Sequence, residues 1–373
     1  MLFLIGKPSS NNYTVLCFPI YMLQDFKLLT FPWILLVVIE FILYLVTLYF
    51  AVKCAFIIVK VRAFHKNLSA LAVVLILQWM EPLIAKMISW PYETGYWTLE
   101  GTTNKSFSNT TIRQWWTEDK SEMVQIIDFD ADFHFFVSGF LKLHYAISMS
   151  NILLVIAIER SLACYFLNDY EKKSRFWIAI TIVLVDQSFN FIVSMVFYLN
   201  YVPFLFMIVI TGTPNVLAIS LMLYSRHYNL KVTRIHEKYA HQSNYSLAAR
   251  FQAKENIKCF DMIGKVLIAG FCIVFFGFVV AIALFLNIFP QLDTLWNLCI
   301  LAVMSLPPIV ICPAIIYSVD SFRCYPFLPI DYIYTKLKVG QRKISVVPRK
   351  GSSAKSEVIR KETETNQLAA SWT

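Results

Sequence analysis

The sequence predicts an all-α membrane protein built as a bundle of seven transmembrane helices. Of the 373 residues, 58% are hydrophobic and 15% are charged, whereas soluble domains contain about 25% charged residues. The apolar residues gather in long stretches, and a helix needs about 20 mostly apolar residues to cross a bilayer. Seven stretches have this character: 31–52, 68–89, 133–158, 176–199, 203–224, 263–288 and 295–317.

The ends of these stretches carry helix-boundary signals. Thr30 can cap a first helix that Pro32 opens, and Asn67 can cap the second. Proline residues predict interruptions of the fifth helix at Pro214 and of the seventh at 307–313. Tryptophan and tyrosine residues lie near the predicted ends, as rings at a membrane interface do: Trp33, Trp90, Tyr92, Tyr198, Tyr201, Tyr224, Trp296 and Tyr317.

Polar residues of the third stretch lie on one half of a helix. At 100° per residue, six polar side chains fall on this half: His134, Ser138, Lys142, His144, Ser148 and Asn151. A helix with a polar half-face suits the centre of a bundle, because neighbouring helices cover it there. The pattern therefore predicts that the third helix is central.

The distribution of basic residues orients the bundle. Most of the 33 Lys and Arg residues lie in four segments on one side of the membrane: 53–66, 160–175, 226–262 and 319–373. Cytoplasmic loops carry the excess of basic residues. We therefore expect an extracellular N-terminal segment 1–30, a bundle at 31–318 and a basic cytoplasmic tail at 319–373. The net charge of +9 follows from this asymmetry and does not indicate nucleic-acid binding.

The charge pattern also allows six helices, with the third stretch outside the membrane and the N-terminus inside the cell. Candidate glycosylation sites favour seven helices, because Asn12, Asn104 and Asn109 begin Asn-x-Ser/Thr motifs that lie outside only in that arrangement. The motifs at Asn67 and Asn244 would then be cytoplasmic, so such motifs also occur by chance. Together with the polar half-face, the sites favour seven helices.

Motifs of enzymatic chemistry are absent from the sequence. It contains no G-x-S-x-G, H-E-x-x-H, phosphate-binding loop or C-x-x-C, and its six His residues show no metal-ligand spacing within a predicted helix. We therefore expect no catalytic residue, no metal and no cofactor. Cys324, just after the last helix, is a candidate for palmitoylation, and a free thiol explains it equally well.

Six of the ionisable residues inside the predicted helices stand out, because charge is rare there and usually faces the protein interior or a cavity. They are Glu40, Glu81, Lys86, Lys142, His144 and Asp186. At about 1.5 Å of helix per residue, Lys142 and three acids on other helices lie at similar depths: Glu40, Glu81 and Asp186. Two interpretations stay open, a polar pocket for a ligand or ion pairs that fix the helices against one another.

Glu159 and Arg160 stand at the inner end of the third predicted helix. An adjacent acid and arginine at a membrane boundary can be an ordinary interfacial ion pair. At the cytoplasmic end of the third of seven helices, the pair also matches the position of the acidic–arginine pair of G-protein-coupled receptors. A role in coupling to a G protein is therefore the second interpretation.

Six ordered segments within residues 15–340 carry a family resemblance: Pro19–Tyr21, Lys60–Leu68, Gln78–Glu81, Pro91–Gly95, Gln114–Thr117 and Glu159–Lys172. Together they resemble the nematode serpentine receptor class epsilon (Sre) family of chemoreceptors. The resemblance implies a seven-helix G-protein-coupled receptor in the plasma membrane of sensory neurons. Its implied partners are membrane lipids, an environmental small molecule and a heterotrimeric G protein, with Glu159 and Arg160 as the coupling residues.

The sequence departs from the rhodopsin-like pattern. The last helix has Cys312-Pro-Ala-Ile-Ile-Tyr317 where Asn-Pro-x-x-Tyr is expected, and no cysteine pair can tie the third helix to the second outer loop. A long acidic segment, 90–130, follows the second helix, and we expect it to organise ligand access. A small transporter or channel remains the alternative function. Ligand-free solute flux in liposomes would favour it, and agonist-dependent nucleotide exchange on a G protein would favour the receptor.

Overall fold

The computed structural model describes most of the chain before residue 328. The described residues are 1–6, 13–61, 63–99, 111–113, 119–120, 123–166, 176–238, 247–286, 288–305, 307–323, 325 and 327. The chain divides into two units, Met1–Tyr325 and Pro326–Thr373, and all described helices and strands belong to the first. The predicted modification sites lie outside the described residues: Asn12, Asn104, Asn109 and Cys324.

The described chain is mostly helical. Its helices are α1 (Trp33–Val61), α2 (Lys66–Leu77), α3 (Met80–Glu93), α4 (Phe133–Tyr165), α5 (Phe176–Tyr198), α6 (Phe204–Lys238), α7 (Leu247–Phe285), α8 (Asp293–Ser305), α9 (Pro307–Ser318) and α10 (Asp320–Arg323). Short 3₁₀ turns at Phe26–Leu29 and Pro290–Leu292 precede α1 and α8.

Six stretches of the described helices are long and apolar enough to cross a membrane. They are Trp33–Val61, Lys66–Glu93, Phe133–Tyr165, Phe176–Tyr198, Ala253–Leu284 and Asp293–Ser318. They correspond to six of the seven predicted stretches, and α6 covers the remaining one, the fifth. The structure thus shows a helical bundle with six candidate membrane spans among the described residues.

The second predicted helix is divided into two. α2 ends at Leu77 and α3 begins at Met80. Pro82 explains the position of this break, because a proline ring clashes with the carbonyl four residues earlier, which here belongs to Gln78. The break was not predicted, although Pro82 indicates it in the sequence.

Prolines were predicted to interrupt the fifth and seventh helices. α8 ends at Ser305 and α9 begins at Pro307, and because residue 306 lies outside the described residues, the interruption of the last span stays a prediction. The interruption predicted at Pro214 is wrong, because α6 runs through this residue without a break. The side chain of Asn215 donates to the backbone carbonyl one turn earlier at 2.8 Å, which supports the helix next to the proline.

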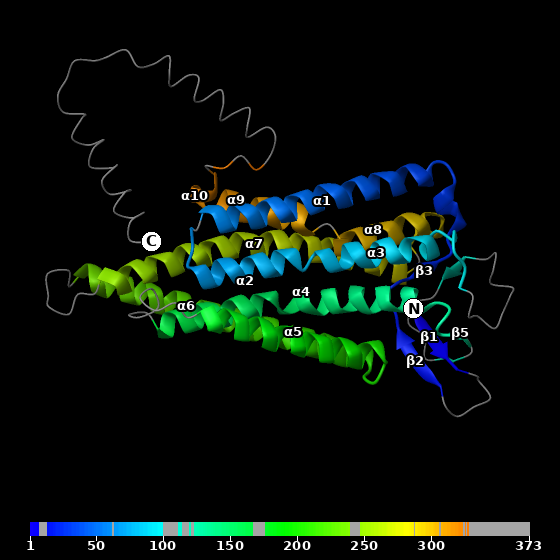
Figure 1. The fold of residues 1–373 in the computed structure, drawn as a ribbon, viewed down its shortest axis with the longest axis horizontal. Helices are drawn as coiled ribbons and strands as arrows, with labels where there is room; N and C mark the ends of the chain where they lie inside the picture. Colours follow the sequence, from blue (N-terminus) through cyan, green and yellow to red (C-terminus); the bar gives the residue numbers. More distant parts are fainter. Residues whose placement is uncertain are drawn as a thin grey trace, which may run out of the picture. The chain divides into compact units, whose positions relative to one another are not determined.

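α4 is the central helix of the described bundle. It packs against α2, α3, α5, α6 and α7. Half of its most apolar stretch is buried, against 22% for the corresponding stretch of α1. Around it, α1 packs on α2 and α9, and α7 packs on α6, α8 and α9, as Figure 1 shows. The central position predicted from the polar half-face is therefore confirmed.

Two small sheets join the N-terminal residues to the segment between α3 and α4. Strand β1 (Leu2–Ile5) pairs antiparallel with β2 (Thr14–Cys17) and parallel with β5 (Val124–Ile126). Strand β3 (Met22–Leu23) pairs antiparallel with β4 (Ile112–Arg113). Figure 1 shows β1, β2 and β5 beside the start of α4. We call this end, where α4 begins and α3 ends, the sheet end of the bundle.

An aromatic cluster packs the sheets onto α4. Phe3 and Phe18 are fully buried against Phe135 and Phe136, and the rings of Phe18 and Phe135 stack with their centroids 4.3 Å apart. Gly139, one turn further along α4, makes room for this contact, because a Cβ atom there would collide with the Phe18 ring. The sheets are thus anchored to the helix by side-chain packing as well as by strand pairing.

Candidate functional site

Buried polar side chains gather at two levels of α4. One group surrounds Lys142, within three turns of the sheet end, and the other surrounds Arg160, near the end of the helix. Eighteen residues of helix separate the two positions by roughly 27 Å. The two groups therefore lie near opposite ends of the membrane-spanning part of the bundle.

Four charged side chains from three helices form a continuous chain near the sheet end. Lys142 of α4 donates to Glu93 Oε1 at 2.7 Å and to Ser89 Oγ at 2.8 Å. Lys86 of α3 lies 2.7 Å from Glu93 Oε2 and 2.9 Å from Glu40 Oε1 of α1. Opposite charges thus alternate from α1 through α3 to α4. We call Glu40, Lys86, Glu93 and Lys142 the charge chain.

The partner of Lys142 differs from the sequence prediction. The expected partners were Glu40, Glu81 or Asp186, but the described ion pair is with Glu93. The prediction was wrong because it ended the second span at residue 89 and assigned Glu93 to the following loop. In the structure α3 continues to Glu93, whose side chain is 2% exposed.

The other predicted network residues make different contacts. His144 Nδ1 lies 2.8 Å from Glu81 Oε2, so these two form a pair between α4 and α3. Asp186 of α5 accepts a hydrogen bond from the neighbouring Gln187 side chain at 3.1 Å. Only Glu40 and Lys142 of the five predicted network residues therefore belong to the charge chain. The single network that the sequence suggested is divided into smaller groups.

Arg160 is fully buried near the far end of α4. Its guanidinium makes two bonds to the carboxylate of Glu159, Nε to Oε2 at 2.5 Å and Nη2 to Oε1 at 2.7 Å. Its Nη1 donates to Asn256 Oδ1 of α7 at 3.0 Å. Glu159 and Arg160 are both 0% exposed. Bidentate pairs of this kind are strong and restrict the geometry of both groups.

Neutral side chains connect Arg160 to α6. Asn256 Nδ2 donates to Asn229 Oδ1 at 3.1 Å, and Asn229 Nδ2 donates to Cys164 Sγ at 2.9 Å. The hydroxyls of Ser161 and Ser225 lie 3.2 Å apart. In the described contacts, α6 and α7 therefore meet this part of α4 through amide, thiol and hydroxyl groups.

A second link joins the start of α2 to α7. The backbone N–H of His65 donates to Glu255 Oε1 at 2.8 Å, and His65 Nδ1 accepts from the backbone N–H of Asn67 at 3.3 Å. Burial, and then the charge of Arg160, lowers the pKa of His65 to about 4. At neutral pH the imidazole is therefore uncharged and can serve as the acceptor that caps α2.

Comparison with known proteins decides the family. The family model described as Sre G protein-coupled chemoreceptor matches residues 1–373. The chain belongs to the Sre family. It is 39% identical to serpentine receptor class epsilon-45 of Caenorhabditis elegans over 100% of both chains. It is 27% identical to serpentine receptor class epsilon-38 of the same organism, over 98% of this chain and 99% of the relative, and 28% identical to serpentine receptor class epsilon-27, over 98% of each.

Membership confirms the resemblance seen in the sequence. The Sre family is a chemoreceptor family and not an enzyme family, and the candidate spans fit a multi-pass membrane receptor. Sequence reasoning missed Glu93 and Asn256. Glu93 was detectable, because it follows Lys86 by seven residues, two turns along one helix face. Asn256 lies in the segment 226–262, which was predicted to be a cytoplasmic loop, and no sequence pattern pairs this residue with Arg160.

Proposed function

We propose that this Sre protein is a seven-helix receptor that binds an environmental chemical from outside the cell and activates a heterotrimeric G protein inside it. The observation that carries the proposal is the buried Glu159–Arg160 pair and its bond to Asn256 of α7. The pair lies in a chain whose whole length matches a G protein-coupled chemoreceptor family. We further propose that the receptor acts in the plasma membrane of sensory neurons.

In the proposed topology, α6 is the remaining membrane span. It follows α5 in the chain and packs against α4 and α7. Seven spans put the sheet end outside the cell and Arg160 at the cytoplasmic face, in agreement with the distribution of basic residues.

Glycosylation tests this topology. We expect at least one of Asn12, Asn104 and Asn109 to carry a glycan and Asn244 to carry none. The measurement is the electrophoretic shift on enzymatic deglycosylation of the full-length protein. A shift that survives Asn→Gln changes at the first three sites but is lost with Asn244→Gln would overturn the orientation.

The proposed activation step separates α7 from α4. In the resting receptor, Glu159 holds the Arg160 guanidinium and Asn256 ties it to α7. Because Glu255 precedes Asn256, movement of α7 would break the His65–Glu255 bond at the same time. The released guanidinium can donate to main-chain carbonyls of a Gα subunit, where its planar fork is better suited than an ammonium group. A ligand drives the change by binding the open state more tightly than the closed one.

Nucleotide exchange tests the proposed function directly. The full-length receptor is placed in liposomes with a purified heterotrimeric G protein and exposed to a panel of volatile and water-soluble compounds. We expect some compounds to accelerate nucleotide exchange with the wild type and not with Arg160→Ala. Ligand-free flux of ions or solutes, without any exchange response, would instead identify a channel or transporter and overturn the proposal.

A further inference from the structure

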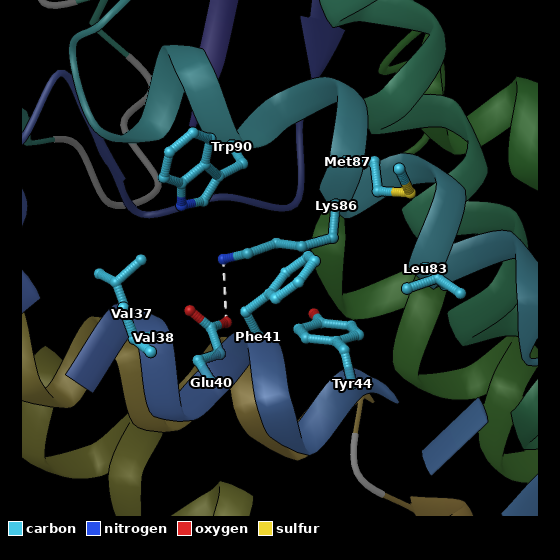
Figure 2. A pocket seen from close by; sticks show the side chains of 9 residues that line it. All are labelled: Val37, Val38, Glu40, Phe41, Tyr44, Leu83, Lys86, Met87 and Trp90. Carbon is cyan, nitrogen blue, oxygen red and sulfur yellow. Dashed lines mark ion pairs between the residues drawn. The ribbon is translucent and has the colours of Figure 1, made fainter. Parts of the chain in front are cut away.

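A pocket lies between α1 and α3, beside the charge chain. Its volume is about 370 Å³, within the range of about 300–1,000 Å³ that is usual for small-molecule sites. Figure 2 shows the side chains of the two helices that face one another across it. Most of its lining is apolar or aromatic, and two charged side chains, Glu40 and Lys86, complete it.

The mouth of the pocket faces the hydrocarbon of the membrane. Three lining side chains are exposed outside the protein, Val38 by 49%, Phe41 by 56% and Met87 by 64%. Exposed apolar side chains on a membrane-spanning helix contact acyl chains, so a guest enters through the bilayer. Glu40 lies seven residues inside the first residue of α1, Trp33, which places the polar part of the pocket about 10 Å below that helix end.

Glu40 retains hydrogen-bonding capacity inside this pocket. Its Oε1 lies 2.9 Å from Lys86 Nζ but receives no well-directed hydrogen bond. Figure 2 shows the Glu40 carboxylate directed toward the Lys86 ammonium, with the ion pair drawn as a dashed line. A carboxylate offers about four acceptor positions. The pocket can therefore satisfy a guest that donates a hydrogen bond.

The charge balance selects a neutral guest. The charge chain contains two carboxylates and two ammonium groups, each paired with the opposite charge. An anionic or cationic guest would add an uncompensated charge in a low-dielectric region, which is costly. A hydroxyl group adds a donor without adding charge.

We propose that the pocket binds a small, neutral, lipophilic alcohol whose hydroxyl donates to Glu40 and whose apolar body packs on Phe41, Met87 and Trp90. Because an apolar cavity of about 150 Å³ holds benzene, this pocket accommodates roughly 15 non-hydrogen atoms. Sterols and diacyl lipids are larger than this, and the headgroups of glycerolipids stay at the interface above Glu40. A freely diffusing alcohol is therefore the occupant that fits both the volume and the depth.

Photolabelling tests the proposed occupant. The full-length protein in phosphatidylcholine nanodiscs is irradiated with a medium-chain alcohol that carries a diazirine, and in parallel with the matching diazirine alkane that lacks the hydroxyl. Mass spectrometry then locates the label. We expect the alcohol to label α1 and α3 about tenfold more than the alkane, as a hydrogen bond to a charged acceptor implies. Equal labelling would overturn the proposal, since the pocket would then hold any acyl chain.

A matched pair of variants locates the binding without disturbing the ion pairs. Val38→Trp fills the pocket mouth, whereas Val52→Trp adds the same side chain to a lipid-facing position of α1 outside the pocket. The two valines are 49% and 50% exposed, so neither change alters a buried contact. We expect Val38→Trp to lose the alcohol label and Val52→Trp to keep it, at equal thermal stability. Equal labelling of the variants, or full displacement of the probe by a sterol, would overturn the site.

The existence of the alcohol site does not depend on the proposed receptor function. Only the further step, that such alcohols are the ligands the receptor senses, rests on that function. Labelling requires no G protein, so the two ideas fail separately. If the alcohol labels the pocket but the protein shows ligand-free flux and no exchange response, the site stands and the receptor function is overturned. If compounds stimulate exchange and no alcohol labels α1 or α3, the site is overturned and the receptor function stands.

Discussion

The two polar groups on α4 are connected to their surroundings by different forces. In the charge chain, Glu93 accepts from both Lys86 and Lys142, so ion pairs join α1, α3 and α4. In the Arg160 group, the ion pair is internal to α4, and the hydrogen bonds of Asn256 with Arg160 and Cys164 join α4 to α7. Breaking one buried ion pair costs about 3–5 kcal/mol, whereas a hydrogen bond from a charged group such as Arg160 contributes about 1.5–3 kcal/mol and a neutral one about 0.5–1.5 kcal/mol.

This difference suits a receptor whose two ends have different tasks. Near the sheet end, ion pairs and stacked aromatic rings hold the helices together, so a binding site there keeps its shape. At the Arg160 end, the described links between helices are mostly hydrogen bonds of neutral side chains, so each link costs less to break than a buried ion pair. Switching transitions commonly use small helix movements between two packed arrangements. The comparison therefore predicts a rigid half at the sheet end and a movable half at the Arg160 end.

At the sheet end, Glu93→Gln is the change with the largest expected effect on stability. The change removes the carboxylate that Lys86 and Lys142 share, and Glu40 then remains as a partner for Lys86 alone. We expect the folded state to lose about 3–5 kcal/mol. The readouts are the thermal unfolding midpoint in nanodiscs and the amount of receptor at the cell surface.

Glu81→Gln is the matched control, because it neutralises another glutamate of α3. The Glu81 side chain is 26% exposed and pairs with His144, so the loss should stay below about 1 kcal/mol. Lys142→Met alone should also lower surface expression, and combined with Glu93→Gln it should restore part of the stability. If Glu93→Gln and Glu81→Gln are equally mild, the charge chain does not hold this end together.

The movable half is tested by changing the two members of the Arg160 ion pair separately. Arg160→Ala should retain ligand binding but lose G-protein activation, because the guanidinium that is proposed to contact Gα is gone. Glu159→Gln should raise basal nucleotide exchange by about tenfold, because one charge-assisted bond no longer restrains Arg160. The measurement is basal and ligand-driven exchange at matched surface expression. Equal small losses in both variants would show an ordinary structural pair.

The anchoring of the sheets to α4 is tested by Gly139→Ala. The added methyl group collides with the Phe18 ring, and overpacking of this kind costs about 1–3 kcal/mol. Gly270→Ala is the control, since a Cβ atom at that position of α7 meets no neighbour within 4 Å. It should be neutral or slightly stabilising. Equal thermal midpoints for the two variants would mean that the sheets contribute little to the stability of the sheet end.

Patterns within single helices were predictable from the sequence. The long apolar stretches located the helices, the polar half-face placed α4 at the centre, and the sequence alone put Glu159 beside Arg160. Contacts between distant segments were not predictable. Asn256 reaches Arg160 across 96 residues and Glu255 reaches His65 across 190, and no local pattern marks such partners.

Exact helix ends and short strands were also not predictable from the sequence. Glu93 was missed because hydropathy decreases near the end of a span, although the helix and its hydrogen bonds continue for another turn. β1 spans only four residues and pairs with β5 more than a hundred residues later. A strand this short has too few residues to show the alternation by which strands are recognised.

The smallest expected effect is a pH dependence of the Arg160 end, through His65. The pKa of His65 falls from 6.5 to about 4 on folding, because of burial and then the charge of Arg160. Below about pH 6.5 the unfolded chain binds a proton there that the folded chain binds only near pH 4. The stability contributed by neutral His65 is therefore fully present above pH 6.5 and is lost as the pH falls toward 4.

Between about pH 7 and pH 5.5 this loss amounts to about 1 kcal/mol, visible as a lower unfolding midpoint. The charged groups that act on the imidazole, besides Arg160, are Glu159 and Lys66, while Glu255 binds its backbone N–H. His65→Asn keeps a side-chain acceptor at the start of α2 and cannot titrate, so the variant should lose the pH-dependent part alone. An identical pH slope in both proteins would assign the titration to another histidine and leave the inner links insensitive to acid.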